Sequence, residues 1–492
     1  MSKFILLGLF FAIMISVGLY SRKKVTNSND FLLGGRNIGP WISAFSYGTT
    51  YFSAVIFIGY AGRIGFNFGI SASWIGIGNA VIGSLLAWLV MAKRTRKMTH
   101  DMNASTMPEF FEKRYDSKSM KIVTGAIIFI FLVPYTASVY QGLGYLFEQA
   151  FNLPYEYCML AMAVLTAAYL MLGGYVATAL NNFIQGIIML AGVIAMIYYI
   201  ITNPAVGGLS EGISRLASIN PDFASAFGPV PINLLGLVIL TSLGSWGLPQ
   251  MVHKFYAIKD EDAVKKGTII STLFCFIIAG GAYFVGSFGR LFFEYNNTAA
   301  PGNPDMVMPM VLQWALPETL FGLIIVLVLS ASMSTLSSLV LVSSSSITMD
   351  LLKSTVYKNM SKKTEMLLLR IFCAVFVIFS FIVAITPNAI LTLMSFSWGT
   401  ISGSFLAPFL YGLYWKGTTK AGAWAGIISG LVCSLGGALL FGMNAGLAPN
   451  IGAVAMIVSL LAVPVVSVIT SKSTDTITSK ATATATETVR IK

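Results

Sequence analysis

Long runs of apolar residues alternate with short polar segments along most of this 492-residue chain. A transmembrane helix needs about 20 predominantly apolar residues to cross roughly 30 Å of hydrocarbon. The pattern therefore predicts an all-α integral membrane protein with about thirteen membrane-spanning helices. The predicted spans are 4–20, 41–69, 71–92, 120–147, 155–172, 178–202, 232–253, 267–290, 318–348, 368–386, 389–415, 421–443 and 449–470.

The segments between these spans are polar and mostly short. We predict connecting loops over 22–40 and 93–119, a longer polar external loop over 203–231, and a short surface helix within 291–317. From Ser471 onward the chain consists mainly of Ser, Thr and Ala. Such low-complexity composition is typical of disorder, so we expect a disordered cytoplasmic tail over 471–492.

Hydrophobic residues make up 56% of the chain and charged residues 10%, whereas about 25% of a typical soluble domain is charged. This excludes a soluble enzyme, a disordered chain and a collagen-like fibre. The formal net charge is +12. When the N-terminus is placed outside, 27 of the 31 Lys and Arg residues fall in cytoplasmic segments, as the positive-inside rule requires. The excess therefore indicates topology, not nucleic-acid binding, and predicts a cytoplasmic C-terminus.

None of the charged residues is predicted near the middle of the membrane. Proton pumps and membrane-embedded hydrolases generally need ionisable groups there, so both classes are disfavoured, and no nucleophile–base arrangement indicates an enzyme. The two His residues have no metal-site spacing, and the four Cys residues are expected to be small buried side chains without disulfides. A bound cation would then need backbone carbonyls, hydroxyls or the substrate as ligands.

Spans two to six and seven to eleven form two blocks of five, which permits an inverted repeat because five is odd. Transporters built from such repeats interrupt helices at matching positions around the substrate. The first span of one block carries Gly48 in a polar patch, and the first span of the other carries Gly244, Gly247 and Pro249. These residues weaken helices, although Gly and Ser also permit close helix packing. The chain is thus predicted to divide into an N-terminal helix and cytoplasmic loop (1–40), a first five-helix repeat (41–202), an external loop (203–231), a second five-helix repeat (232–416), two C-terminal helices (417–470) and a tail (471–492).

A second polar cluster lies in the span 318–348. Ser334, Ser337 and Ser338 share one helix face because they stand at i, i+3 and i+4, and Thr335 is adjacent. Hydroxyl and carbonyl oxygens are hard ligands suited to a cation such as Na⁺. A packing face whose hydroxyls bond back to the helix backbone is the alternative interpretation.

Six segments in order along the chain carry a specific combination of motifs: LLGGRNIGPWISAFSYGTTYFSAVIFIGYA (32–61), STMPEFFEKRYDSK (105–118), LGGYVATALNNFIQGIIMLAG (172–192), GSWGLPQMVHKFYA (244–257), MSTLSSLVLVSSSSITMDLLK (333–353) and FLYGLYWKGTTKAGAWAGIISG (409–430). The combination resembles the sodium:solute symporter family, and its motifs resemble most the bacterial sodium/proline symporter group. The resemblance implies a LeuT-type 5+5 inverted repeat with one extra N-terminal and two extra C-terminal helices. It also implies a protein of the bacterial plasma membrane that functions as a monomer, with Na⁺ as coupling ion and no other cofactor.

The resemblance further implies a sodium site between the first repeat helix and the hydroxyl-rich helix. Carried onto this chain, its ligands are the carbonyls of Thr49, Phe52 and Ala331 and the hydroxyls of Ser334 and Thr335. Some members have a second cation site, whose positions here are Asn182, Ser337 and Ser338. Those members carry a Thr-Asp pair where this chain has Asn181-Asn182. A neutral amide replaces the carboxylate, so we expect one Na⁺ per transport cycle.

The solute pocket is expected between spans two, four, seven and eleven. Proline symporters have an Asp at the position of Tyr51 and an aromatic pair where this chain has Ser245-Trp246, which puts proline itself in question. Arg63 is expected near the external face as a snorkelling or gating residue. The candidate solute contacts are Tyr51, Ser53, Tyr135, Ser138, Gln141, Ser245, Trp246, Gln250, Ser395 and Trp398.

A pocket without acidic side chains suits a neutral, zwitterionic or anionic solute. We therefore predict Na⁺-coupled uptake of a small organic solute, such as an amino acid or related carboxylate, by alternating access. A sugar or polyol is the alternative substrate class. An uncoupled facilitator or a sensor with the same fold also remains open.

Overall fold

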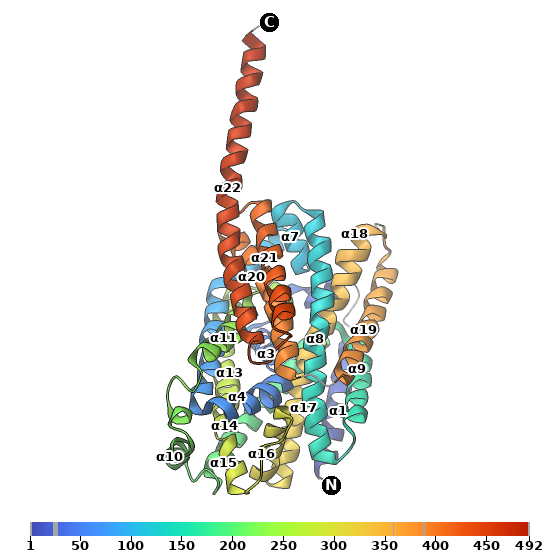
Figure 1. The fold of residues 1–492 in the computed structure, drawn as a ribbon. Coiled ribbons are helices and arrows are strands. Elements are labelled where there is room, and N and C mark those ends of the chain that lie inside the picture. The colour runs from blue at the N-terminus through green and yellow to red at the C-terminus, as the bar shows by residue number, and fades with distance from the viewer. Residues whose placement is uncertain (1, 23–27, 358, 387–388, 491–492) are drawn as a thin grey trace.

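The computed structural model describes residues 2–22, 28–357, 359–386 and 389–490, and it leaves out the side chains of 2–3, 18–22, 28–30, 165–174, 176–177 and 472–490. Within the described ranges the regular elements are all helices, apart from one isolated β-bridge between Ile38 and Ile258. Figure 1 shows a bundle of long helices packed side by side, with α22 projecting from one end. The all-α fold is therefore as predicted.

The elements of the first half are α1 (Ser2–Arg22), α2 (Ser28–Leu33), η1 (Gly34–Arg36), α3 (Pro40–Tyr51), η2 (Val55–Tyr60), α4 (Ala61–Phe68), η3 (Gly69–Ala72), α5 (Ser73–Ala80), η4 (Val81–Leu86), η5 (Trp88–Ala92), α6 (Lys93–Asp101), α7 (Met107–Tyr115), α8 (Lys118–Phe151), α9 (Tyr155–Thr202), α10 (Leu209–Ile219) and η6 (Pro221–Ala224).

The elements of the second half are α11 (Pro231–Ser242), η7 (Leu243–Trp246), α12 (Pro249–Tyr256), α13 (Glu261–Cys275), η8 (Phe276–Gly280), α14 (Gly281–Ser287), α15 (Gly289–Tyr295), η9 (Pro304–Met306), α16 (Val307–Ala315), α17 (Glu318–Ser345), η10 (Ser346–Leu352), α18 (Lys353–Thr355), α19 (Lys362–Ile385), α20 (Ile390–Tyr414), α21 (Lys420–Leu440) and α22 (Ala448–Arg490).

Ten helical stretches among the described residues are long and apolar enough to cross a membrane. The predicted count of thirteen is not confirmed. The predicted spans 41–69 and 71–92 are not counted separately, because the stretch Val55–Asp101 forms one continuous candidate. The apolar part of α1, Phe4–Val17, is shorter than a full span. The predicted spans 155–172 and 178–202 belong to one helix, α9, and many side chains of the first of these lie outside the described residues.

Both predicted helix interruptions are present. Helix α3 ends at Tyr51, and Phe52 takes an extended backbone conformation before the chain resumes as η2. In the second block, Leu248 is extended between η7 and α12, whose first residue is Pro249. Proline disfavours a helical conformation in the preceding residue, which explains the position of the second break.

The first interruption lies four residues beyond Gly48, which corrects the predicted position. Gly48 is inside α3, and a Cβ there would come within 2.3 Å of the Phe274 ring on α13. Its missing side chain therefore lets α3 and α13 pack closely. At this residue the packing interpretation, not the helix-breaking one, is right.

Three segments predicted as loops contain short helices, namely α2 within 22–40, α6 and α7 within 93–119, and α10 within 203–231. The loop prediction was wrong there because helices of about three turns or fewer are too short to show as apolar spans. The short helix predicted within 291–317 is present as α16, but it is mostly buried and does not lie on the surface as predicted. Helix α22 continues to Arg490, so the predicted disordered tail is helical in the backbone, while its side chains lie outside those described.

The polar segments separate to the two ends of the bundle. Figure 1 shows α7 and α18 at the end from which α22 leaves, and α10, α15 and α16 at the end where α1 begins. These are the groupings expected when 93–121 and 349–370 face one side of the membrane and 203–231 and 291–317 face the other.

Helix α17 lies at the centre of the bundle and is buried along nearly its whole length. It packs against α1, α3, α8, α9 and α19, while α20 packs against α8, α21 and α22. The hydroxyl-rich face of α17 consequently lies beside the end of α3. Cys158, Cys275 and Cys373 are buried and Cys433 is half-buried, all as free thiols, as expected.

Candidate functional site

The interruption of α3 leaves backbone groups that a continuous helix would pair internally. In a helix the carbonyl of Thr50 would accept from the N–H of Ala54. That N–H instead donates to the Ser332 hydroxyl of α17, over 2.9 Å. Freed backbone groups survive in a membrane only where protein or ligand satisfies them, and here α17 supplies the partner.

The Thr335 hydroxyl of α17 lies against the freed carbonyls of the interruption. Its Oγ1 is 3.4 Å from the carbonyl oxygen of Thr49, 3.1 Å from that of Thr50 and 3.4 Å from that of Phe52. It is also 3.1 Å from the carbonyl oxygen of Ala331, one turn earlier in its own helix. A hydroxyl has one proton, so at most one of these four carbonyls receives it at a time. The others direct lone pairs into the same small space, which favours a cation.

Ser334 completes this cluster. Its hydroxyl donates to Thr49 Oγ1 over 2.7 Å, and the Thr49 hydroxyl donates in turn to the Phe45 carbonyl over 2.8 Å. The structure thus brings together all five residues expected at the sodium site, from two helices separated by about 285 positions. It adds Thr50, whose carbonyl belongs to the cluster and which sequence reasoning missed. We refer to these six residues, Thr49, Thr50, Phe52, Ala331, Ser334 and Thr335, as the ion cluster.

The hydroxyl row continues one turn further along α17. Ser337 and Ser338 bond back to the Ser334 carbonyl over 2.8 Å and 3.1 Å. Ser338 also lies 3.0 Å from Thr50 Oγ1 and accepts a hydrogen bond from Lys254 Nζ over 2.9 Å. The position of Lys254 corrects the sequence analysis, which placed this residue in a cytoplasmic segment, because its side chain reaches back into the bundle and is buried.

Asn182 of α9 contacts α3 one turn before Thr50. Its Nδ2 donates to the Ser46 hydroxyl over 3.0 Å, while its Oδ1 is buried and has no hydrogen-bond partner in the structure. A buried acceptor without a donor costs free energy, so this oxygen is a candidate ligand for a cation or a water.

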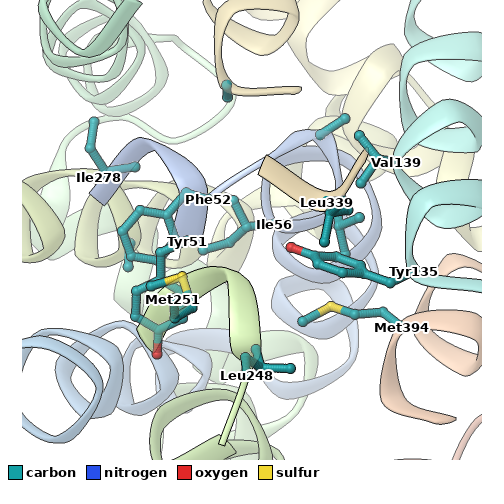
Figure 2. Packing of buried hydrophobic residues seen from close by; sticks show 14 of the residues in the cluster. Tyr51, Phe52, Ile56, Tyr135, Val139, Leu248, Met251, Ile278, Leu339 and Met394 are labelled. Atoms are coloured by element: carbon teal, nitrogen blue, oxygen red, sulfur yellow. The ribbon is translucent and has the colours of Figure 1, made fainter. Parts of the chain in front are cut away.

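A small enclosed cavity borders the ion cluster at the interruption of α3. Four of the ten predicted solute contacts line it: Tyr51, Ser53, Tyr135 and Trp398. Figure 2 shows Tyr51 and Phe52 together at the end of α3, with Tyr135 and Met394 across from them. The Trp398 ring stacks on Tyr51 at 6.1 Å between centroids and meets Tyr135 edge-on at 5.6 Å.

The remaining six predicted contacts lie outside this cavity. The side chain of Gln141 donates to the carbonyl oxygens of Ala384 and Thr386, and Trp246 Nε1 donates to the Ile82 carbonyl. Gln250 is buried, with its Oε1 unpaired. The hydroxyls of the other three make local or interhelical hydrogen bonds: Ser138 to the Tyr135 carbonyl, Ser245 to the Gly83 and Ser242 carbonyls, and Ser395 with the Tyr60 hydroxyl.

Sequence reasoning missed several cavity residues, including Tyr60, Asn79, Thr241 and Tyr283. Asn79 carries a signal, because it is an isolated amide in the apolar run SWIGIGNAVIG. Its Oδ1 accepts from the Tyr51 and Ser242 hydroxyls. The cavity therefore also receives side chains from α5 and α14, two helices beyond the four expected.

The cavity is uncharged and closed. Its lining is aromatic, aliphatic, hydroxyl and amide, with no charged side chain. Its volume is about 20 Å³. A single water needs about 10–15 Å³ on this measure, so an organic solute enters only if the helices around the cavity move.

Arg63 and Asp305 lie near one another at the end of the bundle where α10 and α16 are found. Asp305 is fully buried in the segment before α16, and its Oδ2 accepts from the Ile390 N–H at the start of α20 over 3.0 Å. Burial raises the pKa of this carboxyl from 3.8 to about 6, while the Ile390 N–H and the positive charge of Arg63 act in the opposite direction. This hydrogen bond holds the start of α20, the helix that carries Met394 and Trp398, against the segment before α16.

Two relatives align with this chain over most of its length. It is 30% identical over 474 residues to the osmoregulated proline transporter OpuE of Bacillus subtilis (strain 168), covering 95% of this chain and 94% of that protein. It is 31% identical over 437 residues to the sodium/proline symporter of Staphylococcus aureus (strain JH9), covering 87% of this chain and 84% of that protein.

Solved structures share the fold. A Na⁺-coupled sialic acid symporter in a substrate-bound outward-open state matches with a TM-score of 0.78 at 19% identity, over 94% of this chain and 98% of that one. A nucleobase-cation-symport-1 family transporter in a closed conformation matches with a TM-score of 0.53 at 15% identity, over 88% of this chain and 93% of that one. These neighbours confirm the predicted LeuT-type fold.

The model of the sodium:solute symporter family matches residues 31–430, which include both interrupted helices, the ion cluster and the cavity. Members of this family are transporters, not enzymes. The chain therefore belongs to the sodium:solute symporter family.

Proposed function

We propose that this membrane protein couples the entry of one Na⁺ to the uptake of one small organic solute, an amino acid or a related carboxylate. The observation that carries the proposal is the ion cluster. Four carbonyl oxygens converge on the Thr335 hydroxyl within 3.4 Å, and Ser334 lies at hydrogen-bond distance from Thr49. Neutral hard oxygens from two helices are the ligands that Na⁺ prefers.

Na⁺ would be held by the carbonyls of Thr49, Phe52 and Ala331 and the hydroxyls of Ser334 and Thr335. These ligands come from α3 and α17, so binding joins an interrupted helix to the central helix of the bundle. In a conformation that separates α3 from α17 the ligand set is incomplete. Na⁺ therefore stabilises the arrangement in which the two are together, as differential binding requires.

The solute would bind in the cavity on the other side of the same interruption. Phe52 takes part in both, because its carbonyl belongs to the ion cluster and its ring lines the cavity. This shared segment supports coupling, since an ion that orders the interruption also orders the wall of the cavity. Tyr51, Ser53, Tyr135 and Trp398 would contact the solute, joined by Asn79.

An amino acid or other carboxylate is favoured over a free cation because no acidic side chain lines the cavity. A solute carboxylate near Na⁺ would gain electrostatic stabilisation in this low-dielectric site. The names of the two relatives, a proline transporter and a sodium/proline symporter, support an amino acid. Tyr51 stands where proline symporters carry an Asp, so we do not restrict the proposal to proline.

We further propose that the chain is a monomer in a bacterial plasma membrane, with α1 beginning outside and α22 leaving into the cytoplasm. The basic residues support this orientation, because 26 of the 31 fall in the segments assigned to the cytoplasm when the buried Lys254 is left out. The same side then holds α7 and α18.

The experiment is an uptake and thermal-stability screen of the purified protein. Amino acids, carboxylates and sugars are each offered in Na⁺, K⁺ or choline, with proteoliposomes for uptake. We expect Na⁺ alone to raise the unfolding temperature and to drive accumulation of at least one carboxylate solute. Accumulation of a sugar or polyol instead would establish the alternative substrate class. Solute flux that follows only the solute gradient, with equal rates in Na⁺ and choline, would identify an uncoupled facilitator and contradict the proposal.

A further inference from the structure

Lys254 is a buried cation that the proposed transport cycle does not use. It lies in α12, the second half of the other interrupted helix, and its side chain is 2% exposed. Its Nζ donates to Ser338 Oγ over 2.9 Å and lies 5.2 Å from the centre of the Tyr175 ring. Among the described residues no carboxylate lies within 4.0 Å of this ammonium. The neighbours of this amine inside the bundle are therefore a hydroxyl and an aromatic ring.

The Ser338 hydroxyl is fully used by its neighbours. A hydroxyl oxygen has one proton and two lone pairs. The proton is directed to the Ser334 carbonyl over 3.1 Å, and the two lone pairs face Lys254 Nζ and Thr50 Oγ1 over 2.9 Å and 3.0 Å. A Na⁺ ion at Ser338 would have to displace the ammonium or the Thr50 hydroxyl. It would also stand beside the Lys254 amine, whose protonated form repels a cation strongly in a low-dielectric interior.

Asn182 fits the same pattern. A carboxylate at this position would add a negative charge near α3, which a mobile cation could neutralise. The amide adds none, and its Oδ1 remains without a partner. A positive side chain at position 254 thus accompanies the neutral side chain at position 182.

We propose that Lys254 is a tethered cation that takes the place of a second Na⁺ and limits this symporter to one Na⁺ per solute. The proposal rests on the proposed function, since it concerns the number of ions in that cycle. Lys254 is a positioning residue, because it acts through Ser338 and Thr50. Through these two hydroxyls it links α12 to the interruption of α3, so that a basic side chain tethered to one broken helix reaches the other.

The test counts bound ions with Na⁺ as the only probe. Equilibrium binding of radioactive sodium to the purified protein, without solute, gives the number of ions bound per chain at saturation. We expect one for the wild type and one for Lys254→Arg, which keeps the charge. The double variant Lys254→Met with Asn182→Asp removes the tethered cation and supplies a carboxylate, so we expect two. Its Na⁺-to-solute flux ratio in proteoliposomes is expected to double.

Two controls isolate the cause. Asn182→Asp alone should still bind one ion, because the ammonium still uses Ser338. Asn182→Asp combined with Lys265→Met should also bind one, since Lys265 is an exposed lysine in α13. Unfolding temperatures confirm that each variant is folded, and Lys254→Gln replaces Lys254→Met if that variant is unstable.

The outcomes separate this inference from the proposed function. Two ions bound by the wild type would overturn the inference and leave Na⁺ coupling intact. One ion bound by the folded double variant would also overturn it. No Na⁺ bound by the wild type contradicts the proposed function itself, and the inference falls with it.

Discussion

The ion cluster and the solute cavity lie on two sides of the same interruption of α3, yet they are built differently. Backbone carbonyls and adjacent hydroxyls from only two helices form the ion cluster. Side chains from six helical regions form the cavity. All five residues predicted for the ion cluster lie together, whereas four of the ten predicted solute contacts line the cavity. The ligands of the ion cluster were implied by the resemblance to the family, whereas the solute contacts come from distant helices and no motif specified them.

The two sites also differ in electrostatics. The ion cluster offers oxygen lone pairs in excess of protons, while the cavity offers aromatic faces, hydroxyls and one amide without a formal charge. If the comparison is correct, substitutions can separate ion binding from solute binding although both sites share Phe52.

The largest expected effect is on the ion cluster. Replacing both Ser334→Ala and Thr335→Ala removes two hydroxyl ligands, and each charge-assisted contact contributes about 1.5–3 kcal/mol. We expect the apparent Na⁺ affinity to fall at least 100-fold, since about 1.4 kcal/mol corresponds to a factor of ten. Sodium-dependent thermal stabilisation and uptake at varied Na⁺ concentration measure this change.

Ser343→Ala is the matched control, because Ser343 is a buried hydroxyl of the same helix outside the cluster. It should leave the Na⁺ affinity within about twofold. An unchanged Na⁺ affinity in the double variant would contradict the assignment of the ion cluster as the Na⁺ site. The proposed difference between the two sites would then no longer hold.

The next effect concerns the pH dependence of stability through Asp305, which fastens the cavity helix α20. Its folded-state pKa of about 6 lies above the unfolded value of 3.8, so the stability it contributes is full below about pH 4 and is lost as the pH rises through 6. A rise of about two pKa units corresponds to at most about 3 kcal/mol. We expect Asp305→Asn, which stays neutral, to gain stability relative to the wild type between pH 4 and 7.

Unfolding temperatures of both proteins across this pH range measure the difference. The Na⁺-induced rise should be the same in both, since Asp305 is not part of the ion cluster. Parallel pH profiles for the two proteins would show that the carboxyl does not titrate in this range.

A smaller effect is expected from Tyr51→Phe in the cavity. The Tyr51 hydroxyl donates to the Thr241 carbonyl over 2.5 Å and lies 3.3 Å from Asn79 Oδ1, so its loss removes one of the two hydroxyls beside the amide that lines the cavity. One such contact contributes about 1–1.5 kcal/mol, which predicts a roughly tenfold rise in KM for the solute. The Na⁺ affinity measured without solute should not change.

Ser138→Ala provides the comparison. Sequence reasoning placed Ser138 in the pocket, but its hydroxyl bonds only to the Tyr135 carbonyl within its own helix. Solute KM should therefore stay within about twofold. A larger effect of Ser138→Ala than of Tyr51→Phe would mean that the solute binds elsewhere than in this cavity.

Helix interruptions show both the reach and the limit of sequence patterns. Pro249 forces the preceding residue out of the helical conformation, so the break beside Leu248 follows from local chemistry. At the other break, the sequence predicted an interruption at Gly48. Gly48 instead lies within α3, and the chain leaves the helical conformation at Phe52. What determines that position is α17, whose Ser332 and Thr335 satisfy the freed backbone groups. The residues around Phe52 in the sequence do not indicate that Ser332 and Thr335 will be the partners of these groups.

The sequence by itself determined the apolar spans, the segregation of charge, the two interrupted helices and the hydroxyl row at i, i+3 and i+4, because hydrophobic length and helical periodicity are local properties. Tertiary structure alone decided which side chains line the cavity and where the long side chain of Lys254 ends. Lys254 directly follows a predicted span, as cytoplasmic lysines do, but its ammonium reaches Ser338, 84 positions later in the chain. Helix packing brings such distant groups together, so the chemistry they form is absent from any single stretch of sequence.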